Sequence, residues 1–258
     1  MAPDAGFGRA DPFAPVTSEQ LVVGDGHDLY VESVGQQGGI AAVYLHGGPG
    51  SGCQPDHRRL FDPERFHAVL YDQRGCGRSH PKGSREANTL PHLIADMEII
   101  RQRFGFERWI VVGGSWGATL ALAYAQAHPA RVSGIVLRAT FLGTYEEIEE
   151  GFCRRLPCFY PGLAEDFLEL LPETERSRPL DAYWRRILHA DPAIHGPAAR
   201  PGTTPSAFSR SLRPRARGSM SPRSNPAARC RRRHLWKRIT LSMTASCDRI
   251  SCSRRPKG

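Results

Sequence analysis

Five residues between a predicted buried strand and a predicted helix limit what this chain can fold into more than any other feature. The pentapeptide GGSWG at 113–117 directly follows the apolar run WIVV and leads into an Ala- and Leu-rich segment that predicts a helix over 116–128. A turn this short strains the backbone at Ser115 and presents its hydroxyl beyond the strand, and Gly113 and Gly117 leave room for the chain to pass itself. A glycine-rich helix cap would share the pattern, but this context predicts Ser115 as a nucleophile, with the Trp116 amide donating to an oxyanion.

Alternating strand and helix patterns surround that turn. Buried-strand runs occur at 41–45, 67–71, 109–113 and 134–139, an amphipathic helix is predicted over 89–104, and a hairpin with an Asp-Gly turn over 21–33. Strands that alternate with helices of this length predict an α/β fold with a mostly parallel sheet, helices on both faces and right-handed crossovers. In such sheets the chemistry takes place beyond the carboxyl ends of the strands.

A second glycine-rich segment follows the first of these parallel strands. Residues 46–50 read HGGPG, directly after the run at 41–45. The paired glycines would let a backbone amide, that of Gly48, approach a substrate carbonyl oxygen closely, which predicts a second oxyanion donor. On its own the segment is typical of an ordinary Gly/Pro turn, and that alternative stays open. The structural frame of the two predicted donors comprises His46, Gly47, Pro49, Gly50, Gly113 and Gly117.

The loop after the run at 67–71 reads DQRGCGRS, residues 72–79. We expect Asp72 and Arg74 to pair and to fix this loop beside residues 46–50. The alternative, that Asp72 is the acid of a catalytic triad, conflicts with the usual chain order of serine, acid and histidine in such folds. Cys76 is interpreted as a small packing residue and not as a nucleophile.

These three motifs together resemble one family. HGGPG, DQRGCGRS and GGSWGATLALAYAQAHP, in this order and at these separations, closely resemble the proline iminopeptidases, also called prolyl aminopeptidases, over about residues 20–200. The resemblance implies an α/β-hydrolase core with a helical cap, and a serine peptidase that releases an N-terminal proline through an acyl-enzyme, without a metal or cofactor. In this family cap glutamates hold the substrate amine and aromatic residues hold the proline ring. Phe141 matches the phenylalanine of that pocket, although packing between cap and core would also account for it.

Beyond Phe141 the pattern of apolar residues along the chain changes. Helical periodicity persists without a buried-strand run, which is typical of a helical cap. We therefore predict an α/β-hydrolase core at 1–140, a partial helical cap at 141–200, and a basic, poorly ordered tail at 201–258 that is rich in Arg, Ser and Pro.

The family pattern breaks after the cap. Its members carry a triad Asp and then a triad His there, and neither is found in this sequence. The histidines after Ser115 are His128, His189, His195 and His234. The last of these precedes Asp248, which reverses the order of acid and base, and no buried-strand run precedes either residue. The resemblance therefore predicts a truncated hydrolase with impaired activity.

The net charge of +9 belongs to the tail, because residues 201–258 hold 15 basic residues and one acid. One interpretation is translation in a shifted frame: reading the codons after Arg200 one base earlier permits Ala-Trp-His-Asp-Thr-Glu, which matches the Ala-Trp-x-x-x-Glu of the family, including an amine-binding glutamate. An Arg-rich arm that binds nucleic acid and a divergent but genuine sequence are the alternatives. We favour the frameshift and expect no nucleic-acid partner.

The remaining features point to a protein of the cytoplasm. No leader-like N-terminus and no apolar run of about 18 residues occurs, so neither export nor membrane spanning is supported. Seven cysteines without paired spacing predict reduced thiols and no zinc site. The expected partner is a peptide with an N-terminal proline. The alternatives are another hydrolase of this fold, such as an esterase, and an inactive fragment or Arg-rich binding protein.

Overall fold

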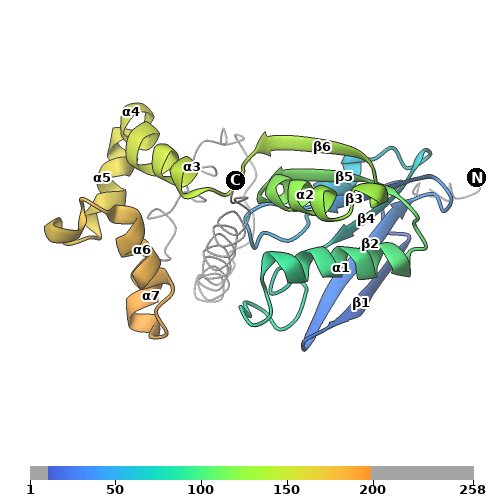
Figure 1. Cartoon of the computed structure of the whole chain (residues 1–258), viewed down its shortest axis with the longest axis horizontal. Helices are drawn as coiled ribbons and strands as arrows, with labels where there is room; N and C mark the ends of the chain where they lie inside the picture. Colours follow the sequence, from blue (N-terminus) through green and yellow to red (C-terminus); the bar gives the residue numbers. More distant parts are fainter. Residues whose placement is uncertain (1–10, 199–258) are drawn as a thin grey trace, which may run out of the picture.

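The computed structural model describes residues 11–198, and the tail predicted at 201–258 lies outside them (Figure 1). Six strands form one sheet in the order β1-β2-β4-β3-β5-β6. Their bounds are β1 Thr17–Gly24, β2 His27–Gly35, β3 Ile40–Leu45, β4 Phe66–Tyr71, β5 Trp109–Ser115 and β6 Val132–Thr140. The pairs β3·β4, β3·β5 and β5·β6 are parallel, whereas β1·β2 and β2·β4 are antiparallel. The predicted α/β fold with a mostly parallel sheet is confirmed.

The hairpin that precedes the parallel strands turns where the sequence predicts it. Strands β1 and β2 are joined at Asp25 and Gly26, whose φ angles are 53° and 72°. Two consecutive residues at positive φ match the twist of the flanking strands, and an Asp-Gly pair adopts this conformation at little cost. The hairpin places β2 against β4 at one side of the parallel strands.

Alternating residues of the central strands enter two different cores. Val43 and Leu45 of β3 pack in a core with the helices α1 (Leu90–Arg103) and α2 (Trp116–Ala127), which lie on one face of the sheet in Figure 1. Ala42 and Tyr44 point to the opposite face and pack with Phe61, which directly follows the short 3₁₀ helix η1 (Pro55–Leu60). Because successive side chains of a strand point to opposite faces of the sheet, an apolar run forms a strand that is buried on both faces. Both α1 and α2 match the helices predicted over 89–104 and 116–128.

A helical segment follows β6, and after Thr140 the described residues contain no strand. Its helices are α3 Tyr145–Glu149, α4 Leu156–Phe159, α5 Pro161–Glu169, α6 Pro179–Ile187 and α7 Pro192–Ala198, with the π-helical turn η3 Glu150–Arg155 between α3 and α4. They bury a core of their own, in which the Phe167 and Tyr183 rings stack at 4.6 Å. Figure 1 shows this segment beyond the carboxyl end of β6, at the side of the sheet on which α2 begins. The division into core and cap at residue 140 stays a prediction.

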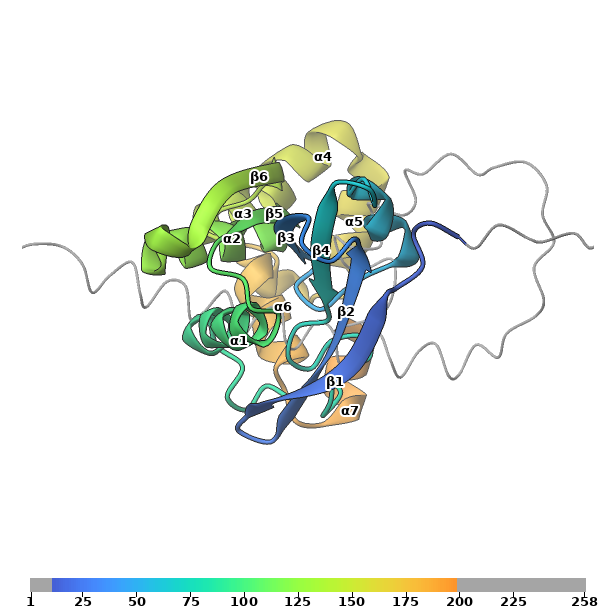
Figure 2. The same cartoon turned by 90° about the vertical axis from the view of Figure 1, so that its right-hand side faces the viewer.

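Within residues 11–198, strand β6 is an edge strand of the sheet and has exposed apolar side chains. It pairs with β5 along one side, and Figure 2 shows it at the border of the sheet. Ile135 and Val136 point to opposite faces, and 39% and 53% of their surfaces are exposed. A strand of a parallel sheet is ordinarily covered on both faces, and an apolar edge strand is a template for pairing with another chain.

We therefore expect a charge on β6 to reduce self-association. The substitution Val136→Lys should lower the fraction of associated protein several-fold, because an edge lysine opposes strand pairing between copies. Sedimentation velocity over a concentration series measures this fraction. Leu60→Lys is the matched control, since Leu60 is 59% exposed and lies on η1, outside every strand of the sheet. An equal reduction by both substitutions would attribute the effect to net charge and not to the edge.

Candidate active site

The junction of β5 and α2 holds Ser115 in a strained conformation. Strand β5 ends at Ser115 and helix α2 begins at Trp116, so no loop separates them. Ser115 has φ 57° and ψ −123°, a region that non-glycine residues seldom adopt, and its residue surface is exposed. Backbone strain of this kind persists only where the surroundings enforce it, and it is typical of the strand-to-helix turn that presents a nucleophile.

The glycines around Ser115 are required by close backbone contacts. A Cβ on Gly117 would lie 2.1 Å from the Leu45 carbonyl oxygen, and a Cβ on Gly113 would lie 2.1 Å from the Gly117 carbonyl oxygen. Both distances are far below a van der Waals contact. The two glycines therefore let the start of α2 approach both β3 and the end of β5, which fixes the sharp bend at Ser115.

The segment 46–50 follows β3 and lies against this bend. A Cβ on Gly47 would be 2.8 Å from the Gly114 carbonyl oxygen and 3.3 Å from the Ser115 Cβ. The next residue, Gly48, has φ 123°, which a side chain would make costly. The structure thus brings residues 46–50 and Ser115 together, as the sequence predicts. The oxyanion roles of Gly48 and Trp116 stay predictions.

Sequence reasoning missed Gln73, the residue that connects these two segments. Its backbone N–H donates to His46 Nε2 at 3.0 Å, its side-chain Nε2 donates to the His46 carbonyl at 2.9 Å, and its Oε1 accepts from the Trp116 indole at 3.0 Å. All three residues are fully buried. The signal that could have found it is its position: Gln73 follows β4, next to β3, so the ends of both strands meet.

His46 is buried in a form that cannot serve as a base for Ser115. Its Nε2 accepts from the Gln73 amide, so Nδ1 carries the proton and donates to the Gly47 carbonyl at 2.9 Å. Burial lowers the pKa of this imidazole, because the charged form would lose its hydration. The side chain is thus neutral, and both of its nitrogens are engaged.

The expected ion pair between Asp72 and Arg74 is wrong. The Asp72 carboxylate accepts from the Arg78 guanidinium at 2.8 Å and from the Cys53 amide at 2.6 Å. Burial alone would raise the pKa of Asp72, but Arg78 and the backbone amides hold it below its usual value. Arg74 instead forms a buried ion pair with Asp96 on α1. Through its own contacts Asp72 stabilises the loop after β4 and ties it to Cys53.

The cysteines of the described residues are all free, including Cys76, which is fully buried and donates its Sγ hydrogen to the Arg74 carbonyl. Burial raises the pKa of the Cys76 thiol, so the reactive thiolate is disfavoured. This agrees with its interpretation as a packing residue. The remaining three, Cys230, Cys247 and Cys252, lie outside the described residues.

Phe141, the remaining predicted site residue, contacts the start of α2. Phe141 follows β6 and is half-buried, and its carbonyl accepts from the Thr119 hydroxyl at 2.6 Å. Its place in a proline pocket stays a prediction. His128 caps the far end of α2, a 12-residue helix that spans about 18 Å. His195 lies in α7, and its Nδ1 is hydrogen-bonded at 3.0 Å to the backbone carbonyl of His189, which lies between α6 and α7. His234 lies outside the described residues.

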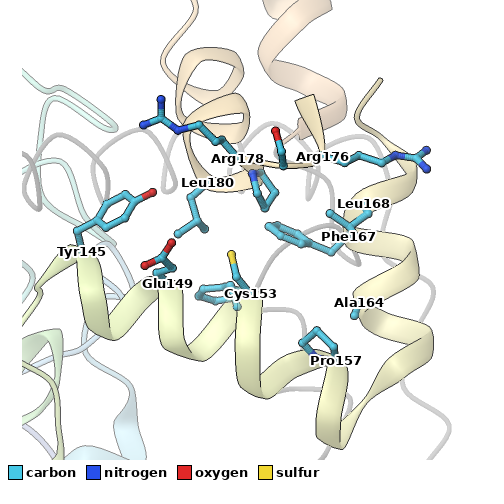
Figure 3. Close-up of a pocket in the computed structure, with 13 residues that line it drawn as sticks. Tyr145, Glu149, Cys153, Pro157, Ala164, Phe167, Leu168, Arg176, Arg178 and Leu180 are labelled. Atoms are coloured by element: carbon cyan, nitrogen blue, oxygen red, sulfur yellow. The ribbon is translucent and has the colours of Figure 1, made fainter. Parts of the chain in front are cut away.

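The helical segment contains a cavity of about 290 Å³ (Figure 3). Figure 3 shows Phe167 and Leu180 lining it, with the carboxylate of Glu149 and the thiol of Cys153 at its wall. None of the predicted site residues lines this cavity, so it belongs to the helical segment and not to the surroundings of Ser115. Across residues 11–198, no three His, Cys, Asp or Glu side chains are grouped to hold a metal, and no helix there could span a membrane.

Comparison with known proteins places the chain in a family. The model of the alpha/beta hydrolase fold family matches residues 43–215. Together with the parallel sheet and the strained serine at its strand-to-helix turn, this shows that the chain belongs to the α/β-hydrolase fold family.

The resemblance to proline iminopeptidases is confirmed by the curated relatives. A proline iminopeptidase of Arabidopsis thaliana is 45% identical over 204 residues, which are 79% of this chain and 54% of that protein. One of Neisseria gonorrhoeae is 43% identical over 190 residues, 72% of this chain and 60% of that protein. The chain thus spans little more than half the length of these relatives. The crystal structure of a proline iminopeptidase from Mycobacterium smegmatis shares the fold, with a TM-score of 0.52 at 19% identity over 72% of this chain and 69% of that one.

Proposed function

We propose that this chain carries the nucleophile of a serine peptidase that releases an N-terminal proline from peptides. The observation that carries the proposal is the positive φ of Ser115 at the β5–α2 junction, with residues 46–50 packed against it. The relatives named proline iminopeptidase support the substrate class. The substrate is a peptide, and no metal or cofactor takes part.

In the proposed reaction, the Ser115 oxygen attacks the carbonyl carbon of the N-terminal proline. A C–O bond forms, and the carbonyl oxygen takes up negative charge beside the amides of Trp116 and Gly48. When this intermediate collapses, the C–N bond breaks and the leaving amine takes the proton of the serine hydroxyl. Water then hydrolyses the proline ester on Ser115.

Proton transfer is the step that this polypeptide supports least. Across residues 11–198, no hydrogen bond joins the Ser115 hydroxyl to a histidine or a carboxylate, and His46 has both nitrogens engaged. Removing the base of a serine hydrolase leaves only the catalysis that oxyanion donors and binding provide. We therefore propose that the 258-residue polypeptide turns over slowly.

The test is the hydrolysis of a proline anilide by this polypeptide. We expect turnover that depends on Ser115 and falls at least about 10⁴-fold below that of a longer relative such as the Neisseria gonorrhoeae protein. Ser115→Ala should remove it, whereas Ser133→Ala, at an exposed serine of β6, should not.

Each other result has a separate meaning. Turnover that survives Ser115→Ala would contradict the assignment of the nucleophile. Turnover close to that of the longer relative would contradict the slow proton transfer. Hydrolysis of short-chain esters without any prolyl substrate would favour the esterase alternative.

A further inference from the structure

Gln73 is hydrogen-bonded to both segments of the candidate site, to residues 46–50 through His46 and to the start of α2 through Trp116. Its backbone and side chain hold the imidazole and the carbonyl of His46, and its Oε1 accepts from the Trp116 indole, each at 2.9–3.0 Å. The Gln73 backbone N–H, one N–H of its side-chain amide and the side-chain oxygen are thus all hydrogen-bonded within the buried core. Burying an amide side chain is costly unless it is bonded in this way, so this geometry is strongly specified.

The two residues that are hydrogen-bonded to Gln73 belong to the two segments that carry the predicted oxyanion donors. His46 begins the segment that contains Gly48, and Trp116 carries the other donor on its own backbone. The two donors come from different elements, the loop after β3 and the start of α2, so their separation depends on what fixes these elements to each other. Oxyanion donors act only when they are held near 3 Å from the developing charge, and a displacement of about 1 Å can cost 100-fold in rate.

We propose that Gln73 is a positioning residue that sets the separation of the Gly48 and Trp116 amides. It touches neither the substrate nor the reacting atoms, and it acts through His46 and the Trp116 side chain. The inference rests on the proposed function in one respect, since it requires that Ser115 reacts through an oxyanion.

The first measurement is the labelling of Ser115 by an alkyl fluorophosphonate. In this reaction an O–P bond forms, the P–F bond breaks, fluoride leaves and the serine proton passes to solvent. Gln73→Met keeps the size of the side chain but removes its donors and its acceptor. We expect the maximal labelling rate to fall about 10- to 100-fold, with a change of less than about 3-fold in the concentration that gives half of this rate. A loss of general stability would not separate the two quantities in this way.

The conservative variant supplies a pH readout. In Gln73→Glu, a protonated carboxyl can donate to the His46 carbonyl and accept from the Trp116 indole, as the amide does, whereas the carboxylate cannot donate. Burial raises the pKa of such a carboxyl, so its neutral form is populated at mildly acid pH. The labelling rate relative to the wild type should therefore rise as the pH falls from 9 to 5.

The matched control is Asn88→Leu. Asn88 is a fully buried amide whose Nδ2 donates to the Arg74 and Ser84 carbonyls, so it supports the same loop without reaching His46 or Trp116. Its loss should leave the maximal labelling rate within about 3-fold of the wild type. Amide hydrogen exchange adds a readout without chemistry: Gln73→Met should speed exchange in residues 46–50, and Asn88→Leu should not.

The outcomes separate this inference from the proposed function. Wild-type labelling and exchange in Gln73→Met, or an equal loss in Asn88→Leu, would overturn the positioning role. Labelling of Ser115 without cleavage of prolyl substrates would overturn the substrate class and leave the role of Gln73 standing. A wild-type protein that forms no Ser115 adduct would overturn both.

Discussion

Gly117→Ala should leave the protein unfolded or destabilised by at least about 3 kcal/mol. The added methyl group would clash with backbone atoms, which cannot move aside as a flexible side chain could. The new Cβ would lie 2.1 Å from the Leu45 carbonyl oxygen and 2.8 Å from its carbon. Relief would need α2 to move away from β3, and that movement would open the core in which Leu120 and Trp116 pack. Urea unfolding followed by tryptophan fluorescence measures the change.

Gly114→Ala is the control within the same five residues. The nearest atoms to a Cβ at Gly114 are the Arg138 Nε and carbonyl oxygen, both at 3.7 Å, which is ordinary contact. We expect this variant to unfold within about 1 kcal/mol of the wild type. If both alanines are tolerated equally, the bend at Ser115 is not held by the close approach of α2 to β3.

Arg74→Met should destabilise the protein by about 3–5 kcal/mol, since it leaves a buried carboxylate without its partner. Arg74 donates to both Asp96 oxygens at 2.7 and 2.8 Å, and the two side chains are 2% and 0% exposed. The same guanidinium holds the Ala87 carbonyl and the Asp25 carboxylate. Its removal therefore loosens the loop after β4, the turn of the hairpin and the start of α1 together.

A double-mutant cycle identifies the partner. Arg74→Met combined with Asp96→Leu should be less destabilised than Arg74→Met alone, because replacing both charges leaves none unpaired in the core. Arg103→Met removes an arginine that is 55% exposed in its pair with Glu19 and should cost less than about 1 kcal/mol. Additive effects of Arg74→Met and Asp96→Leu would show that the buried pair is not coupled.

The elements of the sheet could be predicted because their signals are local. An uninterrupted apolar run such as WIVV predicts a strand, and spacings of three and four residues from Leu90 to Ile100 predict a helix that buries one face. The turn at Asp25 and the bend at Ser115 were also predictable, since each depends on glycines at fixed offsets.

The partners of the polar residues could not be predicted in this way. Asp72 and Arg74 are two residues apart and of opposite charge, which favours a local pair, yet Asp72 binds Arg78 near the other end of the same loop and Arg74 binds Asp96 on α1. The residue type of Gln73 gives no signal, because a glutamine in a polar loop is ordinary, and its position after β4 becomes informative only when the order of the strands is known. Its contacts exist only because β3 lies between β4 and β5 in the sheet.

The sequence by itself determined the strands, the helices and the position of the serine, because hydrophobic period and glycine spacing act over a few residues. Only the tertiary structure decided which carboxylate neutralises which arginine and which amide joins the two predicted oxyanion segments. Those contacts follow from the order of the strands, which brings loops distant in the chain to one edge of the sheet, where hydrogen bonds between loops stabilise buried polar groups.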